Sequence, residues 1–218
     1  MDKEDIIKKT KKFAKDKLYG EGTGHDWWHT LRVWQMAKKI GKKEGADLFV
    51  VELSALLHDI ADWKFQDGGD DSVGAMMAKE WLEKFNVDNN ALSHICQIII
   101  EISFKGAGVQ DKLNSIEAKV VQDADRLDAM GAMGISRCFA YGGSQGRQIY
   151  DPNTKPKMHK SFEEYKKSDS SSINHFYEKL LILKDRMNTK TGKLMAGERH
   201  KFMERYLDRF FREWEGKV

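Results

Sequence analysis

The sequence has few prolines and cysteines and no long apolar run. It has two prolines and two cysteines in 218 residues, and Cys96 and Cys138 lack the spacing of a thiolate metal site or a redox pair. This usage predicts a protein of a reducing compartment. The longest apolar stretch, at Ile98 to Ile100, is far shorter than the roughly 20 residues that a membrane span needs. The charged start MDKEDIIKKT also lacks the apolar core of a signal peptide. We therefore expect a cytoplasmic protein with no membrane partner.

A strong excess of one charge is also absent, since the formal net charge is only +3. Residues 1–18 hold seven lysines against four acids, and residues 184–218 hold ten Lys or Arg against six acids. The residues between them hold 20 basic and 24 acidic side chains. The basic excess lies on terminal segments where charges alternate in sign, as on solvated helix faces. Because a nucleic-acid binder concentrates basic charge over its working surface, nucleic acid is not the favoured partner.

Apolar residues are plentiful by contrast, with 40% hydrophobic and 11% aromatic side chains. This content argues against disorder and for a sizeable core. The apolar residues recur at helical spacing, no strand alternates over a convincing length, and the pattern predicts an all-α, single-domain protein. The expected helices are residues 1–18, residues 26–43, one from Asp47 to His58, one after the GGDDS turn at 68–72, one capped by Asp88, one starting near Ile116, and two in residues 161–218.

Residues 142–160 hold three glycines and both prolines, and they are predicted to form the one long loop. Loops of this length often serve as lids or binding loops. Arg147 lies in its GGSQGRQ segment, which lacks the Gly-Lys-Ser/Thr ending of a phosphate loop and follows a helix instead of a strand. We therefore expect a candidate lid that carries Arg147, and no Walker-type site.

Four short segments place metal-ligand or phosphate-binding residue types within otherwise apolar helices. Imidazoles and carboxylates at the inner end of a core helix are costly to bury unless a cation or another partner is present. Two imidazoles with two carboxylates suit Mn²⁺, Fe²⁺, Co²⁺ or Ni²⁺ better than a structural zinc ion, and Mg²⁺ is a further option. The segments are GHDWWHTLRV with His25, Asp26 and His29, ALLHDIADW with His58, Asp59 and Asp62, VVQDADRLDA with Asp123, Asp125 and Asp128, and SINHFYEK with His175 and Lys179.

The order of His29, His58–Asp59 and Asp125 resembles the H…HD…D metal-binding signature of the HD-domain phosphohydrolase superfamily. DADRLDAMGAMGISRCFAYGG and SSINHFYEKLLILKDRMNT further resemble a bacterial branch associated with metal-dependent nucleotide pyrophosphohydrolase activity. The resemblance covers most of residues 20–215. It implies an HD-type helical bundle in which His29, His58, Asp59 and Asp125 bind a divalent metal ion, with Mn²⁺ favoured.

The resemblance also implies a reaction, the release of pyrophosphate from (deoxy)nucleoside triphosphates by attack of metal-bound water. Asp62 stands where several relatives carry a catalytic Glu, and it is expected to orient or deprotonate that water. Because Asp is one methylene shorter than Glu, a second water could relay the proton. Lys105, His175 and Lys179 are the candidate phosphate-binding residues, with ordinary surface lysines and a polar helix stripe as the alternatives.

Other interpretations of the candidate ligands stay open at this point. His58 and Asp59 could be a hydrogen-bonded pair without a metal, and Asp62 could pair with Lys64. Asp123 and Asp128 could be ligands in a shifted register, or they could pair with Arg32 or Arg126 and support the ligands. His25 is expected in a loop or cap, and His94 is expected on the surface rather than at a second metal.

Two functional alternatives remain beside pyrophosphate release. The same ligand set could serve a nucleotide phosphomonoesterase or phosphodiesterase, and a non-catalytic metal-binding helical signalling module could keep the site without turnover. The apolar stripe from Met203 to Trp214 is either core packing or the seam of a homodimer.

Overall fold

The computed structural model describes residues 1–20, 26–61, 72–102, 113–158 and 170–218. The regular structure in these ranges is helical, and they contain no strand, which confirms the predicted all-α class. The helices form two compact units, one made of the described residues up to Asp125 and the other of those from Arg126 to Val218. In the described ranges, no helix is both long and apolar enough to cross a membrane.

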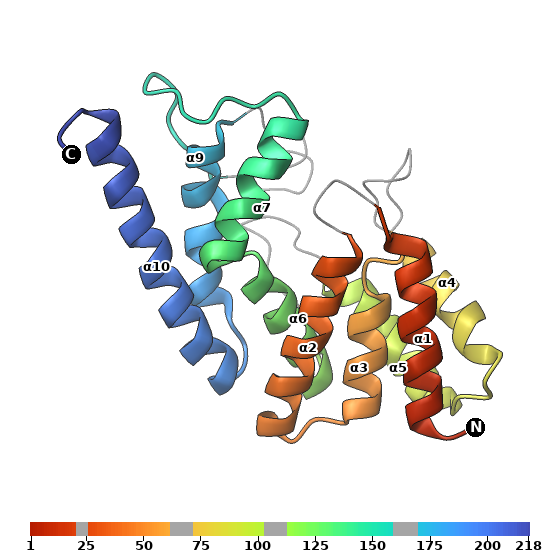
Figure 1. The fold of residues 1–218 in the computed structure, drawn as a ribbon. Helices are drawn as coiled ribbons and strands as arrows, with labels where there is room; N and C mark the ends of the chain where they lie inside the picture. Colours follow the sequence, from red (N-terminus) through yellow and green to blue (C-terminus); the bar gives the residue numbers. More distant parts are fainter. Residues whose placement is uncertain (21–25, 62–71, 103–112, 159–169) are drawn as a thin grey trace. The chain divides into compact units, whose positions relative to one another are not determined.

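The first unit is built around one apolar helix. Helix α3 (Leu48–Leu57) buries its side chains on all faces from Phe49 to Leu57, so it needs neighbours on every side. Figure 1 shows α1 and α2 beside it, and α5 also packs against it. The other helices of this unit are α1 (Lys3–Leu18), α2 (Trp27–Glu44), α4 (Ser72–Glu83), α5 (Asn89–Glu101) and the larger part of α6 (Ile116–Asp128).

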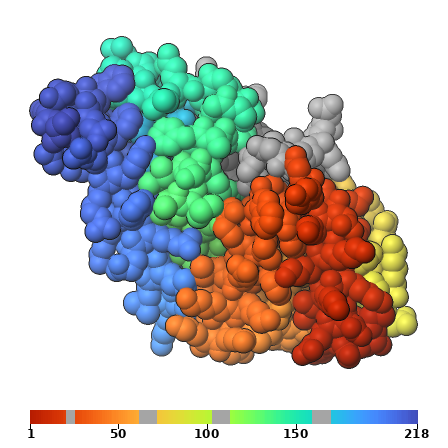
Figure 2. Space-filling view, viewed as in Figure 1, coloured from red at the N-terminus to blue at the C-terminus, as the bar shows by residue number. Residues whose placement is uncertain are grey.

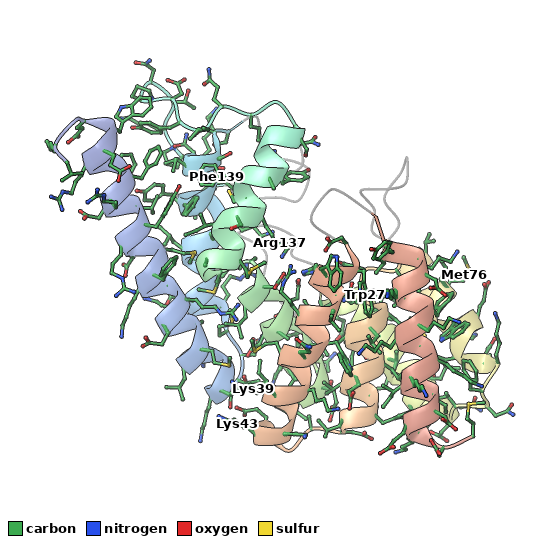
Figure 3. All side chains as sticks on the ribbon, viewed as in Figure 1. Trp27, Lys39, Lys43, Met76, Arg137 and Phe139 are labelled. Atoms are coloured by element: carbon green, nitrogen blue, oxygen red, sulfur yellow. The ribbon has the colours of Figure 1, made fainter. Side chains whose placement is uncertain are left out.

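Aspartates cap several helices of the first unit. Asp26 caps α2 by accepting a 2.8 Å hydrogen bond from the backbone N–H of His29. Asp47 caps α3 in the same way, and Asp88 caps α5 as the sequence predicted. Trp27, labelled in Figure 3, is buried at the start of α2 in a cluster with residues of α1 and α3. The cap and the buried ring together fix the first turn of α2, which carries His29.

The second unit contains α7 (Gly131–Ser144) and the long helix α10 (Lys190–Trp214), which pack against one another. Phe139 of α7, labelled in Figure 3, lies 6.0 Å from the ring of Phe176 and 6.2 Å from that of Tyr206. These rings join α7 and α10 to the segment between them. The outer face of α10 forms part of the surface seen in Figure 2.

Two boundaries differ from the sequence-based expectation. The helix expected over Ile173 to Met187 is three consecutive pieces, α9 (Ser172–His175), the π-helical turn η2 (Phe176–Leu180) and the 3₁₀ segment η3 (Leu181–Arg186). Apolar spacing alone cannot separate these, because all three winding modes keep apolar residues at intervals of three to five. Helix α7 continues to Ser144, so the loop expected from residue 142 starts after it, and its role as a lid stays a prediction.

Candidate metal centre

Local structure fixes both histidines of the candidate site. His29 lies in the capped first turn of α2 and is fully buried. His58 follows the last residue of α3, and its Nδ1 lies 2.8 Å from the carbonyl oxygen of Ala55. Because a carbonyl can only accept, Nδ1 carries the proton and donates it. The Nε2 lone pair of His58 is therefore available to a ligand.

Four predicted ligands converge, although they come from α2, from the turn after α3 and from α6. Nε2 of His29 lies 3.3 Å from Nε2 of His58, 3.2 Å from Oδ2 of Asp59 and 3.4 Å from Oδ1 of Asp125. Nε2 of His58 lies 3.4 Å from the same Asp59 oxygen. His29, His58 and Asp125 alone form a group that could hold a metal ion, since one ligand atom from each lies within 4.8 Å of the others.

These separations fit one shared cation. Ligand atoms bound at about 2.1 Å to one ion lie about 3.0 Å apart at right angles and about 3.4 Å apart at the tetrahedral angle. The observed 3.2 to 3.4 Å falls between those values. A metal-free pair would need a proton between Nε2 of His58 and the Asp59 carboxylate, since two acceptors repel at 3.4 Å. A cation between the two atoms removes that repulsion as well.

The neighbouring aspartates are not part of this group. Asp128 is buried and pairs with Arg137 of α7, with 3.0 Å between Oδ2 and Nη1. Arg137 was not among the partners that the sequence suggested, since no regular spacing links the two residues across the turn at Gly131. Asp123 is fully buried and also lies outside the cluster. Asp26 is a helix cap, as its hydrogen bond to His29 shows.

His94, predicted to be a surface histidine, has partners that the sequence did not suggest. Its side chain is half-buried, and Nε2 lies 2.8 Å from the Ser115 hydroxyl and 3.9 Å from a Glu117 carboxylate oxygen. Both partners lie at the start of α6, far from His94 in the sequence, and only tertiary packing brings them together. Among the described residues, His94 is not in the candidate metal group.

The remaining predicted residues lie elsewhere or outside the described ranges. His175 and Lys179 are half-buried in the second unit, at the end of α9 and in η2, whereas the ligand cluster lies in the first unit. Their phosphate-binding role therefore stays a prediction. His25, Asp62 with its alternative partner Lys64, and Lys105 lie outside the described residues.

Comparison with known sequences decides the family. Residues 27–130 match the HD domain family. YpgQ of Bacillus subtilis is 41% identical over 191 residues, which cover 87% of this chain and 84% of YpgQ. The chain belongs to the HD domain family. All four residues of the predicted H…HD…D order fall inside the matched range.

Solved structures agree with this membership. A protein from Lactobacillus plantarum has a TM-score of 0.86 at 36% identity and covers 99% of this HD-domain chain and 100% of its own. An HD-superfamily hydrolase from Bacillus thuringiensis has a TM-score of 0.77 at 41% identity, covering 98% and 99%. YpgQ in complex with ADP has a TM-score of 0.78 at 36% identity, covering 98% and 97%. The predicted HD-type fold and enzyme class, a metal-dependent phosphohydrolase, are thereby confirmed.

Proposed function

We propose that this HD-domain protein releases pyrophosphate from (deoxy)nucleoside triphosphates, with His29, His58, Asp59 and Asp125 holding the divalent cation. The observation that carries the proposal is the convergence of ligand atoms on Nε2 of His29, which has an imidazole nitrogen and two carboxylate oxygens 3.2 to 3.4 Å away. A nucleotide substrate is supported by the similar protein YpgQ, which was crystallised with ADP.

The donor set favours Mn²⁺, with Mg²⁺, Co²⁺, Ni²⁺ and Fe²⁺ as alternatives, because it mixes nitrogen and oxygen. A bound divalent cation would supply an acidified water and would neutralise charge developing on the attacked phosphorus. The protein itself orients the two histidine ligands. The Ala55 carbonyl holds the His58 ring, and the Asp26 cap holds the turn that carries His29. A ligand held in one rotamer loses little entropy when the cation binds.

Asp62 is proposed to take the proton from the attacking water, because it follows Asp59 by three residues in the same segment. Lys105, His175 and Lys179 are proposed to hold the phosphate chain, where their positive charge would balance its negative charge. The alternative role of Asp62 is an ion pair with Lys64. Asp62→Asn should lower kcat with little change in metal content, whereas a purely structural pair would leave kcat near that of the wild type.

The direct test is a panel of nucleoside triphosphates, diphosphates, monophosphates and cyclic nucleotides, each offered with Mn²⁺ or Mg²⁺. Pyrophosphate and orthophosphate are measured separately. Pyrophosphate in equal amounts with the monophosphate supports the proposal. Orthophosphate alone would replace it with a phosphomonoesterase, and cleavage of only the cyclic substrates would replace it with a phosphodiesterase.

A non-catalytic signalling module is the alternative from another class. It would bind the cation and a nucleotide but show no turnover with any substrate of the panel. An intact ligand cluster argues against it, since a site that no longer turns over substrate need not keep every ligand. The homodimer and the cytoplasmic location remain predictions from the sequence.

A further inference from the structure

A buried carboxylate in the second unit ties two distant residues to one oxygen. Glu178, in η2, is only 2% exposed. Its Oε1 accepts a 2.9 Å hydrogen bond from the backbone N–H of Lys157 and a 2.8 Å bond from the hydroxyl of Ser170. Burying a carboxylate is costly, and hydrogen bonds to a charged acceptor are among the stronger ones that can offset that cost. Glu178 is therefore a clamp on the chain at residues 157 and 170.

Further hydrogen bonds fasten the same stretch. The side-chain amide of Asn174, which is 2% exposed, donates to the carbonyl of Thr154 at 2.8 Å. The backbone N–H groups of Ser172 and Ile173 donate to the carbonyls of Gln148 and Ile149, each at 3.0 Å. Residues 148–157 are thus bound along their length to α9 and η2. Glu178 and Asn174 are the two buried side chains that make these attachments.

The clamp lies inside an unusual turn of helix. Glu178 is the middle residue of η2, a π-helical turn, and π turns are rare and often found at functional sites. His175 directly precedes η2, and Lys179 lies within it. Both are half-buried, whereas Glu178 is buried, so the turn directs the acid inward and leaves the two bases partly accessible. Lys179 shares η2 with Glu178, and His175 is the last residue of α9 before it, so both bases lie next to the hydrogen bonds that Glu178 accepts.

Lys179 and Arg147 of the second unit are two cations whose charges act on the same thiol, that of Cys138. Burial raises the pKa of the Cys138 thiol to about 12, and the positive charges of Arg147 and Lys179 both act to lower it. Both charges thus act on the Cys138 side chain of α7. Arg147 itself is held by its backbone N–H, which donates to the Gly142 carbonyl at 2.8 Å, and its guanidinium lies over the Tyr141 ring at 5.6 Å.

We infer that Glu178 is a positioning residue for phosphate binding: by clamping Lys157 and Ser170 to η2, it holds Lys179 and His175 in the orientation in which, with Arg147, they bind a diphosphate or triphosphate group. The inference rests on the proposed function, in which His175 and Lys179 contact the phosphate chain. Glu178 does not contact the substrate and acts through Lys179.

The test compares Glu178→Ala, Glu178→Gln and Ser170→Ala in the full chain. Asp208→Ala, which removes an exposed acid of α10, is the matched control. For each variant we would measure kcat and KM for a triphosphate, the affinity for inorganic pyrophosphate by calorimetry, the melting temperature, and hydrogen exchange at the Lys157 amide. Glu178→Ala should raise KM and weaken pyrophosphate binding by about tenfold, the scale of one charged hydrogen bond. It should also expose the Lys157 amide and leave kcat within about twofold.

The conservative variant separates positioning from stability. Glu178→Gln keeps an oxygen that can accept from Lys157 and Ser170, so it should restore most of the affinity. In a Lys179→Met background, Glu178→Ala should cause little further loss, because the residue acts through Lys179. If Glu178→Ala does not fold, Ser170→Ala replaces it. This variant removes only the hydrogen bond from Ser170 to Glu178, so the same changes in KM and pyrophosphate affinity should be smaller.

Three outcomes would overturn the inference. The first is that Glu178→Ala loses hydrogen-exchange protection at the Lys157 amide while KM and pyrophosphate affinity stay unchanged. The second is a fall in kcat and melting temperature with no change in KM, which indicates general destabilisation. The third is full additivity with Lys179→Met. If the wild type binds pyrophosphate but turns over no nucleotide, the proposed function fails while the binding data still decide the role of Glu178. If the wild type binds no pyrophosphate, both fail.

Discussion

The Nε2 atoms of His29 and His58 lie 3.3 Å apart, although 29 positions separate the residues in the sequence. One histidine starts a capped helix and the other ends an apolar one, and α2 and α3 pack side by side. The rings meet with their planes inclined at 61° and their centroids 5.3 Å apart. Two nitrogens held this close beside carboxylates are a site that favours a cation.

Removing a ligand should remove the metal. His58→Ala and Asp125→Ala are each expected to lower bound Mn²⁺ to background and to reduce hydrolysis by at least about a hundredfold, since each deletes a direct metal contact. Metal content by mass spectrometry and far-ultraviolet circular dichroism would be measured together. His94→Gln is the control, because His94 is a histidine outside the cluster. Turnover that survives both alanine variants would refute the site.

The pair of Asp128 and Arg137 is expected to stabilise the fold without holding the metal. Asp128→Ala leaves the Arg137 charge without this partner, and we expect a loss of about 3 kcal/mol in the free energy of unfolding. Metal content should stay at the wild-type level. A double change, Asp128→Leu with Arg137→Met, should cost less than the sum of the two single changes. Loss of metal from a folded Asp128→Asn variant would instead support the shifted ligand register.

Gly142 permits a close approach of α7 to Ser172. A Cβ built at this position would lie 2.3 Å from the Ser172 hydroxyl oxygen, whereas one at Gly143 meets nothing within 4 Å. We expect Gly142→Ala to lower the free energy of unfolding by about 1–3 kcal/mol, and Gly143→Ala to leave it unchanged or slightly higher. Urea titrations of both variants measure this. Adding Ser172→Ala to Gly142→Ala should recover much of the loss, and equal effects at the two glycines would contradict the packing explanation.

The Cys138 thiol should be unreactive and should make stability depend on alkaline pH. Its pKa is raised by burial from about 9 to about 12, so it stays protonated at pH 8 and reacts slowly with iodoacetamide in the folded protein. Above pH 9 the unfolded chain loses this proton and the folded chain keeps it. The free energy of unfolding should therefore fall as the pH rises from about 9 towards 12. Cys138→Ala should flatten that part of the curve, and an unchanged slope would show that other groups control it.

Part of the fold and of the metal centre could be predicted from local patterns. Helical spacing identified the all-α class, and the Asp88 cap was visible because capping is a contact between close neighbours in sequence. The four candidate ligands could be named because their order resembles a known signature. The affinity of a site for a divalent cation depends on the type of donor atom. Residue identity gives that type without knowledge of the fold.

Packing between distant segments decided the rest. Asp128 pairs with Arg137, and His94 meets Ser115 and Glu117, because helices bring together residues with no fixed spacing. Glu178 gave no signal in the sequence, where it stands in an ordinary amphipathic stretch. Only its burial and its bonds to Lys157 and Ser170 set it apart. The sequence by itself determined the helices and the kinds of ligand atom, since both depend on local chemistry. Tertiary structure alone decided which charges are paired and which turn is clamped, because those contacts form only once the chain is folded.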